Sequence, residues 1–176
     1  MKKITKSIIL SIALIACSIT TNAQDFLEKF QNQSQIETVV VNKKMFQMMS
    51  NVKMDQTNKD NVAYVNLIKK LDDLKVFTTK SNSRGSEMKA YVSTYVKTKG
   101  MDELMSVTDQ GSNVNFYVNK AATNQNIKEL VMFVDGNSTK ETVILCLSGN
   151  FSLNEISLLT NKMKLPVGDA LNKVSK

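Results

Sequence analysis

The chain has 176 residues, with 23 basic and 16 acidic side chains and no histidine. Without histidine, Ser-His-Asp, Cys-His and His-Glu-x-x-His chemistry are excluded, together with the commonest metal ligand. Arg84 is the single arginine among the basic residues, and arginine is the residue that binds phosphate and guanine in a bidentate manner, so we expect no nucleic-acid partner.

Residues 1–23 have the layout of an export signal. Three lysines within the first six residues precede an apolar stretch from Ile8 to Ile19. Small side chains at Thr21 and Ala23 then suit cleavage before Gln24. The apolar stretch is shorter than the ~20 residues that span a bilayer, so we do not expect a permanent transmembrane helix. Because the three lysines leave with the signal, the net charge falls from +7 to +4.

The same segment allows a second interpretation. Leu14-Ile15-Ala16-Cys17 resembles a bacterial lipobox, in which the cysteine becomes an acylated first residue that anchors the protein to a membrane. No acidic residue follows Cys17 until Asp25, and a cysteine in an apolar segment also acts as a small hydrophobic residue. Two expectations stay open: a signal peptide over 1–23, or a lipoprotein signal that ends before Cys17. The first predicts an exported protein of the periplasm or the extracellular space, and the second predicts a membrane-anchored lipoprotein that contacts the membrane only through Cys17.

Residues 24–176 are of ordinary single-domain size. Cys146 is the only cysteine after the signal, so an intramolecular disulfide is excluded if cleavage falls before Gln24. It lies within the apolar run Val143–Leu147, which predicts a buried strand residue, because a reactive thiol needs exposure and a positive neighbour.

The first elements alternate between helix and strand. The spacing of Phe26, Leu27 and Phe30 predicts a short helix within 25–35, and the β-branched run Ile36–Val41 predicts a strand. Asn42 is a suitable cap for a helix over 43–49. A polar connection follows over 51–60.

Two helical stripes come next. Apolar residues repeat at three and four positions from Tyr64 to Leu74, which predicts an amphipathic helix, and residues 75–79 then change to β-type. Residues 81–86 have the composition of a loop. A second stripe runs from Met88 to Val96, and Gly100 is expected to end that helix.

The second half changes to strand periodicity. Residues 104–109 and the alternating segment 113–119 predict one hairpin. The apolar runs 130–134 and 142–147 predict another, with two central strands. Ser152 and Glu155 have capping-box spacing and begin a last helix. Pro166 marks a break before a short polar tail that ends at Lys176.

These elements predict an α+β fold. We expect a mostly antiparallel sheet, made of a four-stranded C-terminal meander plus one or two N-terminal strands, with helices packed on one face. The other face is then wet, covered by the N-terminal segment, or used for binding. Most methionines lie on apolar patterns and are assigned to the core; these are Met45, Met48, Met49, Met88, Met132 and Met163.

Site chemistry is sparse. Ser148 follows an apolar strand and is the best-placed serine for a Ser/Lys dyad, but serine and glycine are also ordinary turn residues. Asp72 and Asp73 are adjacent, and neighbours on a helix do not face each other. The remaining acidic residues fall on separate elements without calcium-loop spacing. We therefore assign no catalytic, cofactor-binding or metal residue and expect neither an enzyme nor a cofactor.

Three segments carry a resemblance to a known family: Thr38–Met49, Leu104–Asp109 and Leu147–Phe151, which contains a Gly-Asn step before the last helix. With these segments the sequence resembles the bacterial domain-of-unknown-function 4252 family (DUF4252). It implies an exported or envelope protein of certain Gram-negative bacteria. Some relatives are encoded beside extracytoplasmic-function sigma factors, which implies a link to envelope-stress signalling. The family brings no catalytic residues.

Three functional hypotheses follow. The first is a non-enzymatic binding or regulatory module of the envelope with another envelope protein as its partner. The second is a carrier of a small apolar molecule or lipid, held between the sheet and the helical stripe of Tyr91 and Tyr95. The third is the Ser/Lys hydrolase.

Overall fold

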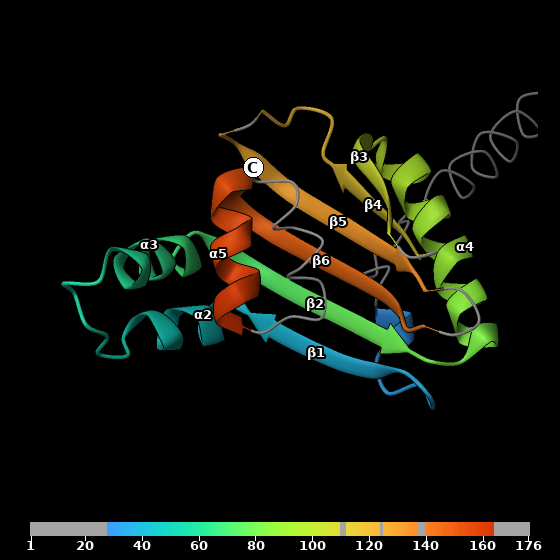
Figure 1. Ribbon diagram of the computed structural model, residues 1–176, viewed down its shortest axis with the longest axis horizontal. Helices are drawn as coiled ribbons and strands as arrows, with labels where there is room; N and C mark the ends of the chain where they lie inside the picture. Colours follow the sequence, from blue (N-terminus) through green and yellow to red (C-terminus); the bar gives the residue numbers. More distant parts are fainter. Residues whose placement is uncertain (1–27, 110–111, 124, 137–139, 164–176) are drawn as a thin grey trace, which may run out of the picture.

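The computed structural model describes residues 28–109, 112–123, 125–136 and 140–163. The signal, the choice between Gln24 and Cys17, and the polar C-terminal tail lie outside the described residues. The described chain forms one antiparallel six-stranded sheet in the order β1-β2-β6-β5-β4-β3 (Figure 1). The strands are β1 (Glu37–Asn42), β2 (Leu71–Thr79), β3 (Asp102–Asp109), β4 (Ser112–Val118), β5 (Ile127–Asp135) and β6 (Thr142–Phe151).

Three helices cover one face of this sheet. They are α2 (Lys43–Ser50), α3 (Lys59–Ile68) and α5 (Leu153–Met163). Phe46 of α2 and Leu67 of α3 are fully buried there, against strand residues such as Leu74 and Phe116. Helices α3 and α5 also pack on each other. This three-helix face holds the larger hydrophobic cluster.

The opposite face carries α4 (Asn82–Lys99) and the segment that begins with the 3₁₀ turn η1 (Glu28–Phe30). Met88 and Val92 of α4 pack on Phe77 and Ile144, and Phe30 completes the cluster. The predicted α+β class is confirmed, as are the meander and both N-terminal strands. One detail differs: helices lie on both faces, not on one. Because β2, β5 and β6 are apolar on both sides, the second face also needs a cover.

Several local predictions are confirmed. The Asn42 side chain accepts a hydrogen bond from the Met45 amide and caps α2. Gly100 ends α4 in the left-handed conformation, with φ 60° and ψ 42°, which glycine adopts without a steric cost. The hairpins β3–β4 and β5–β6 form as expected, and β5 and β6 are central.

Two boundaries were predicted wrongly. The helix expected to reach Leu74 ends at Ile68, and Leu71 and Leu74 belong to β2. Their spacing of three fits a helix, but in a strand buried on both faces apolar residues occur at every spacing. Residues 82–86 are helical and open α4, although their composition indicated a loop. In the N-terminal segment, helical structure is limited in the described part to η1.

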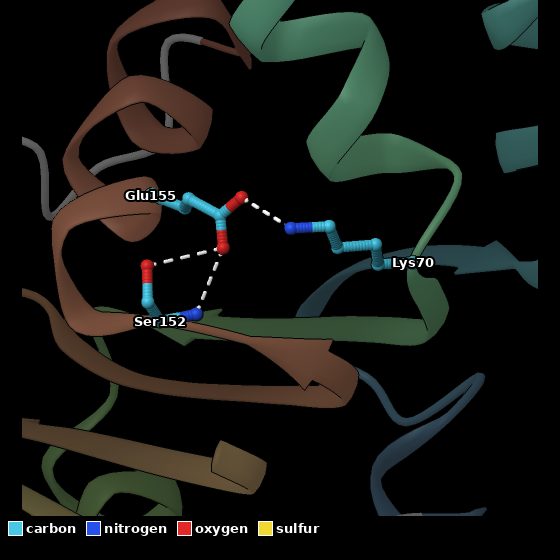
Figure 2. A network of polar contacts seen from close by, with 3 residues as sticks. All are labelled: Lys70, Ser152 and Glu155. Carbon is cyan, nitrogen blue, oxygen red and sulfur yellow. Dashed lines mark hydrogen bonds and ion pairs between the residues drawn. The ribbon is translucent and has the colours of Figure 1, made fainter. Parts of the chain in front are cut away.

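The start of α5 is tied to the end of α3. Figure 2 shows Glu155 reaching back to Ser152, whose amide and hydroxyl donate to Glu155 Oε2 at 2.9 and 3.1 Å. Glu155 Oε1 lies 2.7 Å from Lys70 Nζ. Burial acts to raise the pKa of Glu155, but the bonds from Lys70 and Ser152 outweigh it, and the pKa lies below its usual value. One half of the predicted capping box therefore forms, because Glu155 accepts from the Ser152 amide. The other half does not, because the Glu155 amide donates to the Ser152 carbonyl oxygen rather than to the serine hydroxyl. Within the described residues, no helix combines the length and apolarity needed to cross a membrane.

Candidate functional site

A polar pocket of about 230 Å³ opens on the face that α4 only partly covers. Its floor is formed by three neighbouring strands. Ser148 of β6 lies between Asp73 of β2 and Glu129 of β5, and Cys146 lies beside Lys75. Tyr95 of α4 supplies a wall. Because side chains alternate along a strand, these residues share the α4 face, while Leu74 and Leu147 enter the core on the other side.

Strand irregularities lie on both sides of Ser148. The β2–β6 pairing shifts between Leu71 and Asp73, and the β5–β6 pairing shifts between Ile127 and Glu129. Gly149 lies at this point with φ 155°, and a Cβ atom there would come within 2.5 Å of the Lys70 carbonyl oxygen. Bulges change the direction of side chains and are frequent beside functional sites. The two pairing shifts and Gly149 therefore influence the direction in which Asp73, Ser148 and Glu129 point toward the pocket.

The charged groups of the pocket are paired inside it. Lys75 is only 8% exposed, and its Nζ lies 3.3 Å from a carboxylate oxygen of Asp73. The Tyr95 hydroxyl donates a short hydrogen bond to Glu129 Oε1. The pocket thus holds two carboxyl groups and one ammonium group.

Desolvation dominates the electrostatics of these groups. Burial raises the pKa of Asp73 and lowers the pKa of Lys75, which are the directions in which desolvation moves an acid and a base. Burial also raises the pKa of the Cys146 thiol. The pKa of Tyr95 is raised by burial first and by its hydrogen bond to Glu129 second. Burial therefore favours the neutral form of each of these side chains.

Ser148, the serine singled out in the sequence, lines this pocket together with Lys75. Its direct neighbours across the sheet are the two carboxyl residues rather than the lysine. Cys146 is a free cysteine on β6, as predicted, but it is half-buried and reaches the pocket. Its raised pKa keeps it a thiol, which is a poor nucleophile.

The two adjacent aspartates point in different directions. Asp72 is exposed and pairs with Lys43 at 2.7 Å, whereas Asp73 faces the pocket. Among the described residues no group of three or more His, Cys, Asp or Glu side chains could hold a metal ion. The acidic residues therefore form no metal centre in this part of the chain.

Helix α4 packs closely on the sheet at the stripe where a carrier would hold an apolar molecule. Tyr91 makes an edge contact with Phe30 at 5.0 Å, and Lys29 lies over the Tyr91 ring at 4.1 Å. Tyr95 is bonded to Glu129. A groove of about 370 Å³ follows the other side of α4, where Lys89 pairs with Asp135 at 2.7 Å. The space along this helix is thus lined by polar as well as apolar groups.

The methionine assignment holds only in part. Met88 and Met132 are fully buried, as expected. Met45 and Met48 are 48% and 59% exposed, so their assignment to the core was wrong. Met49 is partly buried, and the side chain of Met163 lies outside the described part. Met45 and Met48 are exposed because only one edge of α2, centred on Phe46, faces the sheet.

Lys75 and Glu129 were not singled out from the sequence. One signal was available for Lys75, because it stands alone between apolar residues in Leu74-Lys75-Val76-Phe77, and a charged residue inside a buried strand needs a partner. No local signal marks Glu129. Its place in the pocket depends on the pairing of β5 with β6.

The comparison with protein families places this pocket in a known domain. A family model described as Domain of unknown function (DUF4252) matches residues 30–159. The chain belongs to this family. The matched DUF4252 region contains every residue of the polar pocket. No match was found among curated proteins or solved structures.

Proposed function

We propose that this DUF4252 protein is an exported, non-enzymatic binding module of the bacterial envelope, and that its polar pocket recognises a small molecule with an ammonium group. Export is supported by the layout of residues 1–23. The regulatory role, linked to envelope stress, is supported by the family resemblance. The ligand class is supported by the charges of the pocket.

The observation that carries the ligand class is the excess of carboxyl groups. Asp73 is paired with Lys75, which leaves the charge of Glu129 in excess. Tyr95 occupies one acceptor position on Glu129, and a carboxylate has about four. An ammonium group beside Glu129 offsets the cost of burying that carboxylate. The volume of about 230 Å³ lies below the ~300 Å³ at which drug-sized sites begin, so the ligand is small.

Ethanolamine is a suitable probe, because ethylene glycol matches its shape without the charge. We expect titration calorimetry to detect saturable ethanolamine binding, on the order of millimolar, and none with ethylene glycol. Glu129→Gln should abolish binding, whereas Glu103→Gln, at an exposed position on β3, should not. Equal binding of the two probes, or equal loss in both variants, would contradict the ammonium site.

The Ser/Lys hydrolase is the second candidate, because Ser148 and Lys75 line one pocket. Purified protein incubated with activated esters tests it. Turnover that is lost in both Ser148→Ala and Lys75→Met would overturn the non-enzymatic proposal. We expect the unmodified protein to show no more turnover than a variant that carries both Ser148→Ala and Lys75→Met.

Export is tested separately. Intact mass spectrometry of protein from host envelopes should show a first residue at Gln24 or an acylated Cys17. A full-length chain found only in the cytoplasm would contradict export without affecting the ligand site.

A further inference from the structure

Strand β1 is an uncovered edge of the sheet in the described part of the chain. It pairs with β2 on one side only. Val39 is 50% exposed and Val40 is 45% exposed, on opposite faces of the strand. The pairing with β2 continues without a shift from Glu37 to Asn42. A regular, β-branched edge of this kind is a template for another strand.

The opposite edge of the sheet, β3, is protected. Between Glu103 and Met105 its pairing with β4 skips one residue, which makes Leu104 a bulge. Asp102 and Glu103 add acidic side chains at the same end. Bulges and charges are the usual means of preventing edge-to-edge pairing. The molecule thus blocks one edge and leaves β1 open.

We propose that β1 pairs with β1 of a second copy of this chain, antiparallel and around a twofold axis at Val40. The charge distribution along the strand carries this choice of partner. Glu37 is exposed at the start of β1, and Lys43 and Lys44 follow its end. Antiparallel pairing brings the start of one strand beside the end of the other, so each Glu37 lies next to the lysines of the second copy.

Other arrangements of two copies lack this match. A parallel pair of β1 strands places Glu37 beside Glu37 and lysine beside lysine, which is repulsive. Pairing of β1 with β3 of another copy meets the bulge at Leu104. The antiparallel arrangement also stops at two copies, because a twofold interface uses the same surface of both and leaves only the two protected β3 edges. It joins the two sheets into one.

The interface is small, so the dimer is expected to depend on concentration. Six residues of β1 provide less area than the ~800 Å² per partner of a typical stable complex. Sedimentation equilibrium from about 10 μM to about 1 mM covers the corresponding affinities. We expect a monomer–dimer equilibrium within this range. A monomer at every concentration would overturn the proposal.

Val40→Lys places two like charges at the twofold axis and should raise the dimer dissociation constant by about tenfold or more. Leu104→Lys is the matched control, because Leu104 is 40% exposed on the other edge strand. It should leave the dissociation constant unchanged. Equal effects of the two variants, or none from Val40→Lys, would overturn the proposal. The thermal unfolding midpoint of each variant verifies that it is folded.

Charge reversal tests the orientation. Lys44 is the better lysine to change, because Lys43 contacts Asp72 within its own chain. Glu37→Lys and Lys44→Glu should each weaken the dimer, and the two changes together should restore it. A double variant that is weaker than either single variant would exclude the antiparallel arrangement, even if a dimer forms.

Discussion

The two faces of the sheet are covered in different ways. Among the described residues, twenty buried apolar side chains form the cluster of the three-helix face, against nine on the α4 face. The first face combines three helices with strand residues alone, whereas the second depends on one helix and the segment around Phe30 and Ile36. Where α4 leaves the strands uncovered, the polar pocket and the groove appear.

The two faces therefore differ in how much they contribute to stability. Burial of apolar surface is the main favourable term in folding, and most of it lies on the three-helix face. The α4 face instead keeps desolvated polar groups, Lys75 and Asp73 among them, which contribute little net stability. Side chains that are costly to bury and unnecessary for the core are consistent with the binding pocket that we propose on this face.

The largest expected effect is on the three-helix face. Phe46 is fully buried, so Phe46→Ala should lower the free energy of unfolding by about 3–5 kcal/mol, through lost burial and a new cavity. Its neighbour Met45 is 48% exposed, and Met45→Ala should change stability by less than ~0.5 kcal/mol. Urea unfolding measures both. Similar losses in the two variants would show that α2 does not anchor this face.

An intermediate effect is expected where α4 meets the sheet. Gly85→Ala in a free helix would stabilise by ~1 kcal/mol, but here the new Cβ lies 2.8 Å from Thr142 Oγ1. Thr142 is buried and β-branched, so it cannot rotate away freely. We expect a loss of about 1–3 kcal/mol.

Thr142→Ala removes the obstructing atom and provides the control. In that background, Gly85→Ala should become neutral or stabilising in urea unfolding. Losses that simply add in the double variant would show that the close approach of α4 to β6 is not the cause.

The smallest effect is expected in the pocket, from Asp73→Asn combined with Lys75→Met. Replacing a desolvated ion pair by neutral groups of similar size is often stabilising. Because Asp73 is partly exposed, we expect a gain of only about 1 kcal/mol at neutral pH.

The gain should depend on pH in a defined way. The raised pKa of Asp73 gives the unmodified protein stability below pH 3.8, which is lost as the pH rises through the folded-state pKa. The lowered pKa of Lys75 costs stability at neutral pH, and this stability returns as the pH rises toward 10.5. The difference between the two proteins should therefore be greatest near neutrality and shrink at both extremes. A difference that is constant with pH would contradict desolvation as its cause.

Local structure was predictable where the signal is contained in a short segment. The cap at Asn42, the stop at Gly100 and both hairpins each depend on neighbouring residues. Leu71 and Leu74 were misassigned because a strand buried on both faces has no period of its own. The second layer of helix was missed for the same reason, since α4 covers the side of β2, β5 and β6 that a one-faced sheet would leave wet.

The candidate site was predictable only in part. Ser148 could be found because it follows the apolar run Val143–Leu147 in the sequence, although β6 continues through it to Phe151. Its surroundings could not, because Asp73 and Glu129 reach it through two separate strand pairings. Lys75 is the one pocket residue whose type conflicts with its local pattern, and a buried charge of this kind points to a site before the fold is known.

The strand order also sets the timing of folding. The pairing of β2 with β6 joins the two N-terminal strands to the C-terminal meander, and the chain between them contains α4, β3, β4 and β5. Strands β2 and β5 each lack one of their two neighbours until β6 is available. Pairings between strands that are distant in the sequence form slowly, because the chain between them must be brought together, at an entropic cost, before the strands gain any contacts. Among the described strands β6 is synthesised last, so the sheet cannot be complete before the ribosome has passed Phe151.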